Sequence, residues 1–94
     1  MSDAWRWEYD PDEAHVVAGL PGHVISEVER LAHELVDLAG LGVGIADIGK
    51  GPQPGVPGGL RRLGIGGDGW LCFLAMPRLR LIVITRVIPP YEDF

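Results

Sequence analysis

The side chains of this sequence best suited to binding an anion are the arginines of its C-terminal half. Residues 59–90 carry five arginines and one acid, whereas residues 1–48 carry ten acids and two arginines. A guanidinium group keeps its charge and offers a planar fork that fits carboxylates and phosphates. The asymmetry is typical of a basic binding face opposite a solvated acidic one, although ordinary surface arginines would give the same count. The five arginines are Arg61, Arg62, Arg78, Arg80 and Arg86.

The last of these arginines fall in an apolar segment, residues 79–88, that reads as a β-strand. Its sequence, LRLIVITRVI, is rich in β-branched residues. Because side chains alternate across a strand, the odd positions form one face and the even positions the other. The odd-numbered positions, which include Leu79, Leu81, Val83 and Val87, carry no charged residue and are therefore expected to face the core. Arg80 and Arg86 are therefore expected to share the opposite, open face.

Two further apolar segments precede this strand. Residues 60–65 and 70–76 are separated by the turn sequence GGDG, and residues 77–78 make a second short connection. Short connections join antiparallel neighbours, so a three-stranded meander is predicted. In residues 60–65, inward-facing Leu63 and Ile65 would turn Arg62 outward to join Arg80 and Arg86. Arg61 shares the inward parity and is expected at the start of the strand.

The N-terminal half predicts one strand and two helices. Residues 5–10, WRWEYD, alternate between aromatic and charged side chains, as a half-buried strand does. A short helix with Asp10 as its N-cap and Pro11 in its first turn is expected to stop at Gly19. Residues 22–39 carry an apolar stripe at helical spacing that must cover a sheet face. We therefore expect an α+β fold in two layers, with the helices on a small antiparallel sheet.

Length and composition favour one soluble domain spanning residues 1–94, with a Gly/Pro-rich loop at 40–59. This loop does not match the phosphate-binding loop pattern. The single cysteine, Cys72, lies in an apolar run and is expected to be a core residue of a cytoplasmic protein. The apolar runs are too short to span a bilayer. His33 has no companion at a ligand spacing, so neither a metal nor a cofactor is expected.

The stretch LRRLGIGGDGWLCFLAMPRLRLIVITRV, taken with the element order, resembles the RelE/ParE family of bacterial toxins from type II toxin–antitoxin systems. Gly69–Trp70 stands where that family usually has Gly-Tyr. The resemblance covers residues 5–88 and implies the order β-α-α-β-β-β. It also implies an antitoxin partner and one of two activities. One branch of the family is a metal-independent endoribonuclease that cuts mRNA on the ribosome (an mRNA interferase), and the other inhibits DNA gyrase.

RNA cleavage needs a group that stabilises charge on the phosphate and groups that move protons. The resemblance implies catalytic roles for Arg62 and Arg86, with Tyr91 in place of a C-terminal aromatic or histidine. Arginine suits the phosphate but cannot act as an acid or a base at neutral pH. The remaining C-terminal arginines are expected to bind RNA or an acidic partner. They are Arg61, Arg78 and Arg80.

The sequence also departs from the RNA-cutting pattern. Leu71 and Gly64 stand where basic residues are usual, and the acidic end YEDF would repel RNA. The net charge of −5 is unusual for a general nucleic-acid binder. A catalytically inactive scaffold that binds a protein partner, and a homodimer, therefore stay open beside the toxin hypothesis.

Overall fold

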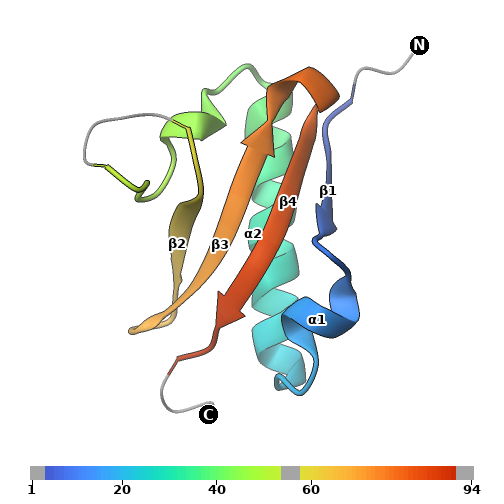
Figure 1. Ribbon diagram of the computed structural model, residues 1–94, viewed down its shortest axis with the longest axis vertical. Coiled ribbons are helices and arrows are strands. Elements are labelled where there is room, and N and C mark those ends of the chain that lie inside the picture. Colours follow the sequence, from blue (N-terminus) through green and yellow to red (C-terminus); the bar gives the residue numbers. More distant parts are fainter. Residues whose placement is uncertain (1–3, 54–57, 91–94) are drawn as a thin grey trace.

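The computed structural model describes residues 4–53 and 58–90, which form an α+β fold with two helices and a four-stranded mixed sheet (Figure 1). This confirms the expected fold class. Two short 3-10 turns, η1 and η2, separate the predicted elements. In chain order the elements are β1 (Arg6–Tyr9), α1 (Glu13–Val17), α2 (Gly22–Gly40), η1 (Ile45–Asp47), β2 (Arg61–Ile65), β3 (Gly69–Met76), η2 (Pro77–Leu79) and β4 (Leu81–Ile88).

The sheet has the strand order β1-β4-β3-β2. β3 pairs antiparallel with β2 on one side and with β4 on the other, as the short connections predict. The expectation of a purely antiparallel sheet is wrong, because β1 pairs parallel to β4, with Trp7 opposite Ile82. The chain passes through both helices and two strands before it returns beside β1, and only such a long connection can join parallel neighbours.

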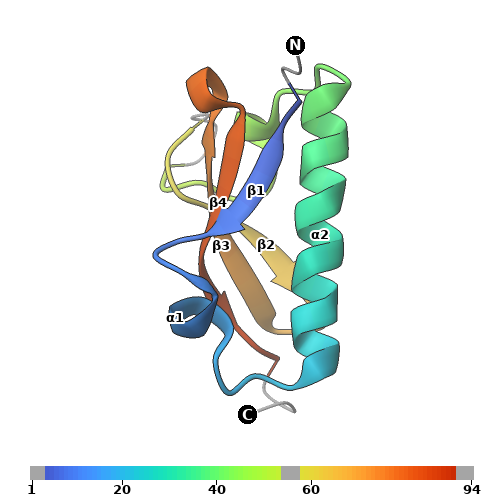
Figure 2. The ribbon, with the colours of Figure 1, turned by 90° about the vertical axis from the view of Figure 1, so that its right-hand side faces the viewer.

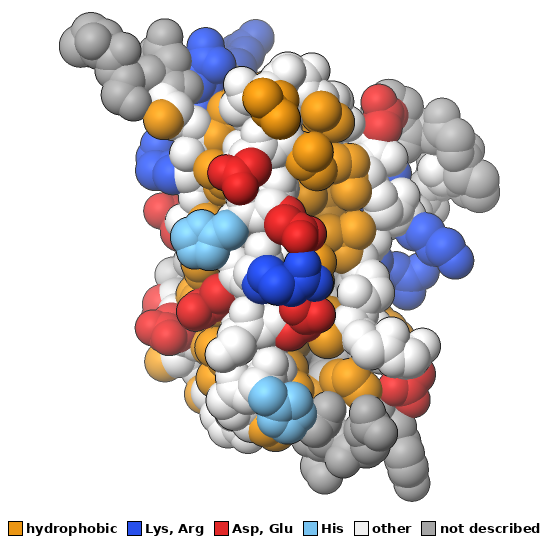
Figure 3. Space-filling model, turned by 180° about the vertical axis from the view of Figure 1, so that it is seen from behind, with side chains coloured by type: hydrophobic (Ala, Val, Ile, Leu, Met, Phe, Trp, Pro, Cys, Tyr) orange, Lys and Arg blue, Asp and Glu red, His pale blue; other side chains and the backbone are white. Residues whose placement is uncertain are grey.

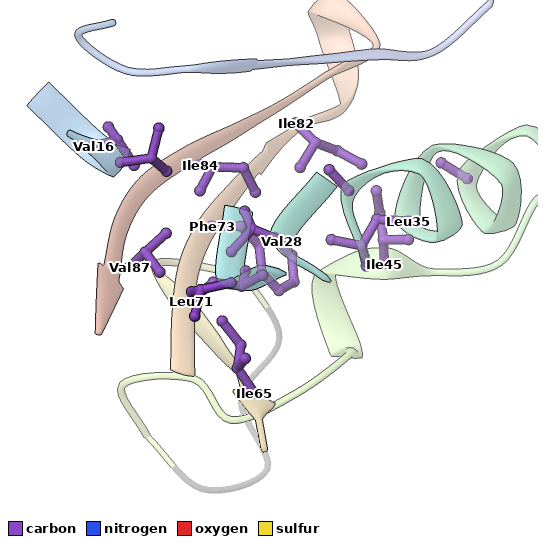
Figure 4. Packing of buried hydrophobic residues seen from close by; sticks show 14 residues of the cluster. Val16, Val28, Leu35, Ile45, Ile65, Leu71, Phe73, Ile82, Ile84 and Val87 are labelled. Atoms are coloured by element: carbon purple, nitrogen blue, oxygen red, sulfur yellow. The ribbon is translucent and has the colours of Figure 1, made fainter. Parts of the chain in front are cut away.

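Helix α2 covers one face of the sheet, and α1 lies at the sheet edge beside β4 (Figures 1 and 2). The buried stripe of α2 packs against side chains of β3 and β4 (Figure 4). Phe73, Ile82 and Ile84 have no exposed surface and lie at the centre of this core. We call the face that α2 covers the core face and the other the open face. The buried cluster is Val16, Val17, Val24, Val28, Ala32, Leu35, Ala39, Ile45, Ile65, Leu71, Phe73, Ile82, Ile84 and Val87.

The predicted faces of β4 are reversed over its first half, residues 81–84. Phe73 pairs with Ile84 and Cys72 pairs with Arg86, so Thr85 is an extra residue in β4. Such a bulge shifts the alternation of side chains by one position. Ile82 and Ile84 therefore join the core on one side of the bulge, and Val87 joins it on the other. The odd-position prediction is wrong for Leu81 and Val83, and Leu79 lies in η2 with half of its surface exposed.

The N-terminal elements agree with the sequence pattern except at the first helix. Trp7 and Tyr9 are half-buried against the core. The N-cap of α1 is Asp12, not Asp10, since its Oδ1 accepts a 2.9 Å hydrogen bond from the His15 backbone N–H. α1 ends at Val17, two residues before the expected stop, and α2 ends one residue after Ala39.

The outward face of α2 is polar over its N-terminal half (Figure 3). Arg30 pairs there with Glu27 and Glu34, at 2.5 and 2.6 Å. Toward the C-terminal end hydrophobic side chains gather on this side (Figure 3). Leu38 in the last turns of α2, and Leu41 and Val43 just after it, are exposed. Over residues 4–53 and 58–90, no helix is long and apolar enough to cross a membrane.

Candidate anion-binding face

Arg62, Cys72 and Arg86 form a row across the open face, one residue from each of three adjacent strands. Arg62 pairs with Cys72 in the β2–β3 ladder, and Cys72 pairs with Arg86 in the β3–β4 ladder. The neighbours of Cys72 in β3 are core residues, so alternation places the row on the opposite side from α2. Strand spacing puts the backbones of Arg62 and Arg86 about 10 Å apart. Both arginines are exposed, and we call the three residues the arginine row.

Cys72 lies between Arg62 and Arg86 in this row, and its thiol is buried. Burial raises the pKa of the Cys72 thiol, and the positive charges of Arg62 and Arg86 oppose that rise without cancelling it. The thiol is therefore protonated at neutral pH. The expectation of a buried Cys72 is confirmed, but the side chain belongs to the open face and not to the cluster under α2. In the row, the Cys72 thiol is therefore an uncharged group between two cationic residues.

Trp70 lies beside the arginine row, at the start of β3. The guanidinium carbon of Arg62 lies 5.5 Å from the centre of the Trp70 ring, within reach of a cation–π contact. The half-buried indole forms part of the wall of a surface hollow of about 470 Å³ at the β2 edge. We call this hollow the Trp70 pocket. Its lining is Gly49, Lys50, Arg62, Leu63, Gly64, Gly67, Asp68, Gly69 and Trp70.

Lys50 reaches the pocket because a short bridge ties the glycine-rich loop to β2. The Lys50 backbone N–H donates to the Arg62 carbonyl at 3.0 Å, and the Arg62 N–H donates back to Lys50 at 2.9 Å. Gly49 makes this approach possible, since its φ is +73° and a Cβ there would overlap the Arg62 carbonyl oxygen. Two basic side chains, Lys50 and Arg62, therefore line one pocket together with the acid Asp68.

Arg61 lies on the core-face side of β2, as its parity predicts, and only 5% of its surface is exposed. Its Nη2 donates to the Gly49 carbonyl at 2.9 Å and its Nη1 to the Gly58 carbonyl at 3.2 Å. Its Nε donates to the carbonyl of Ile48. The side chain therefore fastens the glycine-rich loop to the sheet. The expectation that Arg61 binds RNA or an acidic partner is corrected for this reason.

Arg78 and Arg80 are exposed but lie outside the arginine row. Arg78 is in η2, and Arg80 follows it in a left-handed conformation with φ +49°, one residue before β4 begins. η2 is at the end of the sheet opposite the β2–β3 turn (Figure 1). The expectation that Arg80 is a strand residue on the face of Arg86 is therefore wrong. Tyr91 lies outside the described residues.

The chain matches no family model, no curated protein and no solved structure. Function is therefore inferred from the geometry of the arginine row and its surroundings. Among the described residues no group of three His, Cys, Asp or Glu side chains could hold a metal ion. The three histidines of the sequence lie on α1 and α2, and none of them belongs to the strands that carry the row.

Sequence reasoning missed Lys50 and the pocket beside Trp70. Residues 40–59 have no hydrophobic period, so nothing in the local pattern shows that Lys50 returns to pair with Arg62. The presence of Gly64 opposite Trp70 in the ladder was the available signal. A glycine inside a strand often marks a place where another molecule or chain segment approaches closely.

Proposed function

We propose that this protein is a RelE/ParE-like toxin of a type II toxin–antitoxin system that binds RNA through its open sheet face. The observation that carries the proposal is the arginine row, in which Arg62 and Arg86 flank Cys72 on adjacent strands. Lys50 and Trp70 lie beside Arg62, which adds a positive charge and an aromatic surface. Basic side chains combined with exposed aromatic rings are the usual means of binding single-stranded RNA.

In this proposal the two arginines hold one phosphate between them and stabilise the charge that builds up on it during cleavage. Fixed cationic donors aimed at developing charge are among the strongest contributions to catalysis. The protonated Cys72 thiol does not serve as a base at neutral pH. We assign the proton transfer to Tyr91, which follows Pro90 in the sequence. The ribosome and its mRNA are the proposed target.

The same face is the proposed contact for an antitoxin. Leu74 and Met76 of β3 and Ile88 of β4 are half-buried on the open face, beside the exposed Arg86. Such a mixture of apolar and cationic side chains fits an acidic, amphipathic segment of a partner protein. An antitoxin bound there would cover the arginine row and block RNA at the same time.

A second function, a binding module without cleavage activity, is favoured by the chemistry inside the row. Of the described side chains, Cys72 is the only row member that could exchange a proton near neutral pH, and its pKa is raised. Gly64 also leaves the middle of β2 without a basic side chain on the open face. A module of this kind would bind RNA or an acidic partner and leave transcripts intact.

Expression in a bacterial host tests the two functions. We expect the wild-type protein to arrest growth and to produce new mRNA ends, and the Arg62→Gln/Arg86→Gln double variant to do neither. Arg30→Gln, which removes a charge from the outward face of α2, is the matched control and should behave as wild type. Normal growth with intact transcripts, at a level where the folded protein is detected, would contradict the toxin function and leave the binding module.

A further inference from the structure

We propose that the Trp70 pocket is a subsite for one nucleobase of single-stranded RNA, stacked on the indole of Trp70 with its phosphate on Arg62 and Lys50. This inference rests on the proposed RNA binding and names the part of the RNA that the open face recognises. It adds a base-reading element at the β2 edge to the phosphate-binding row.

The pocket has the size and shape that a base requires. Its volume of about 470 Å³ is within the range of roughly 300–1,000 Å³ that is usual for small-molecule pockets. Gly64 pairs with Trp70 across the ladder and contributes no side chain above the sheet. A Cβ built at Gly64 meets nothing within 4 Å, so the space beside the indole is open to a flat ligand. β2 is an edge strand of the sheet (Figure 1). Its residues Arg62, Leu63 and Gly64 line the pocket, which is therefore at the side of the sheet that an extended RNA segment can approach.

The indole offers a surface that every base can use. Bases stack on aromatic side chains because each has a π-face, and this makes such contacts tolerant of sequence. The ring of Trp70 is half-buried, and Arg62 lies within cation–π distance of it. The same arginine therefore holds a positive charge close to the stacking surface, where it can bind the phosphate of a stacked nucleotide.

The charges of the pocket favour a nucleotide over an acidic peptide. Lys50 and Arg62 supply two cations and Asp68 one anion among the lining residues. A peptide carboxylate would use the cations but would leave the flat indole wall without a matching group. A nucleotide uses both, since it joins an anionic phosphate to a planar ring.

The experiment compares two fluorescent probes on the full-length protein by anisotropy. One is a short oligoadenylate and the other a ribose-phosphate chain of the same length without bases. Wild type should bind oligoadenylate about tenfold more tightly, as expected for one stacked base. Gly64→Leu, which fills the pocket from a position with room for a side chain, and Trp70→Leu should both bind the two probes equally.

Leu41→Ala, which shortens an exposed apolar side chain just after the C-terminal end of α2, is the matched control and should keep the tenfold preference. Equal binding of both probes by the wild-type protein would overturn the base subsite while leaving RNA binding through phosphates in place. Failure of wild type to bind either probe would contradict the proposed RNA binding itself. Circular dichroism of each variant shows whether its fold is kept, and the wild-type comparison alone decides the case if a variant does not fold.

Discussion

Arg61 and Arg62 are neighbours in sequence but lie on opposite faces of β2. Arg61 is buried and donates hydrogen bonds to backbone carbonyls of the glycine-rich loop, whereas Arg62 is exposed and contacts Trp70. One arginine therefore stabilises the fold and the other is available to a ligand. The strand alternation separates the two roles within two residues.

Substitution of these two arginines should have very different effects on stability. Arg61→Ala leaves the carbonyls of Ile48, Gly49 and Gly58 without their donor, and we expect a loss of about 3 kcal/mol in the free energy of unfolding. Arg62→Ala removes only an exposed cation–π contact, worth about 0.5–1 kcal/mol. Urea unfolding followed by circular dichroism measures both. Equal losses would show that Arg61 does not hold the loop.

The arginine row can be tested through the reactivity of Cys72. The guanidinium groups of Arg62 and Arg86 lower the pKa of the thiol from the high value that burial gives it. Arg62→Gln and Arg86→Gln should each move the pH midpoint of iodoacetamide alkylation upward, since each removes a stabilising charge from the thiolate. Arg30→Gln should leave the midpoint unchanged. If neither substitution changes the pH midpoint of alkylation, the two arginines do not act on the Cys72 thiol.

Stability should fall at high pH because of the same thiol. A pKa raised in the folded state means that the folded protein holds its proton more tightly than the unfolded chain does. The contribution of Cys72 is therefore complete below the unfolded pKa of about 8.5 and is lost as the pH rises through the folded value. Tyr9, whose pKa is raised chiefly by burial, adds a similar loss at still higher pH. The contribution of Cys72 is measured as the difference in the free energy of unfolding between wild type and Cys72→Ala, by urea unfolding at successive pH values. A difference that stays constant from neutral to alkaline pH would contradict the raised pKa.

Long periodic segments and short connections allowed most of the fold to be predicted. The apolar stripe of residues 22–39 marks α2 because a helix repeats its faces every 3.6 residues. The meander follows from connections too short to join parallel strands. The bulge at Thr85 could not be predicted. β4 carries aliphatic residues on both faces, so no alternation of polar and apolar residues marks where the faces change over.

The candidate site was only partly predictable for a related reason. Arg62 and Arg86 could be assigned to the open face. For Arg86, however, even-numbered residues of β4 face the open side only after the bulge, which the sequence does not reveal. The partners of Arg61 and the approach of Lys50 depend on how the glycine-rich loop folds back on β2. Glycine permits many backbone conformations, so its sequence does not specify that path.

The glycine-rich loop provides a test at one backbone position. Gly49→Ala places a Cβ against the Arg62 carbonyl at a positive φ, and should cost more than about 1 kcal/mol of stability while weakening the Lys50–Arg62 bridge. Gly64→Ala is the matched control, since a Cβ there meets nothing within 4 Å. Hydrogen exchange at the Lys50 and Arg62 amides reports on the bridge. Unchanged protection in Gly49→Ala would show that this glycine is not needed for the loop's approach.

The most direct test of the central claim is the salt dependence of RNA binding. The logarithm of the association constant should fall linearly with the logarithm of salt concentration, with a slope of about −0.7 for each phosphate contact to single-stranded RNA. The Arg62→Gln/Arg86→Gln double variant should bind more weakly and lose about 0.7 units of that slope, because the two arginines hold one phosphate between them, while Arg30→Gln keeps the wild-type value. A double variant with the wild-type affinity and slope would show that the arginine row does not bind RNA.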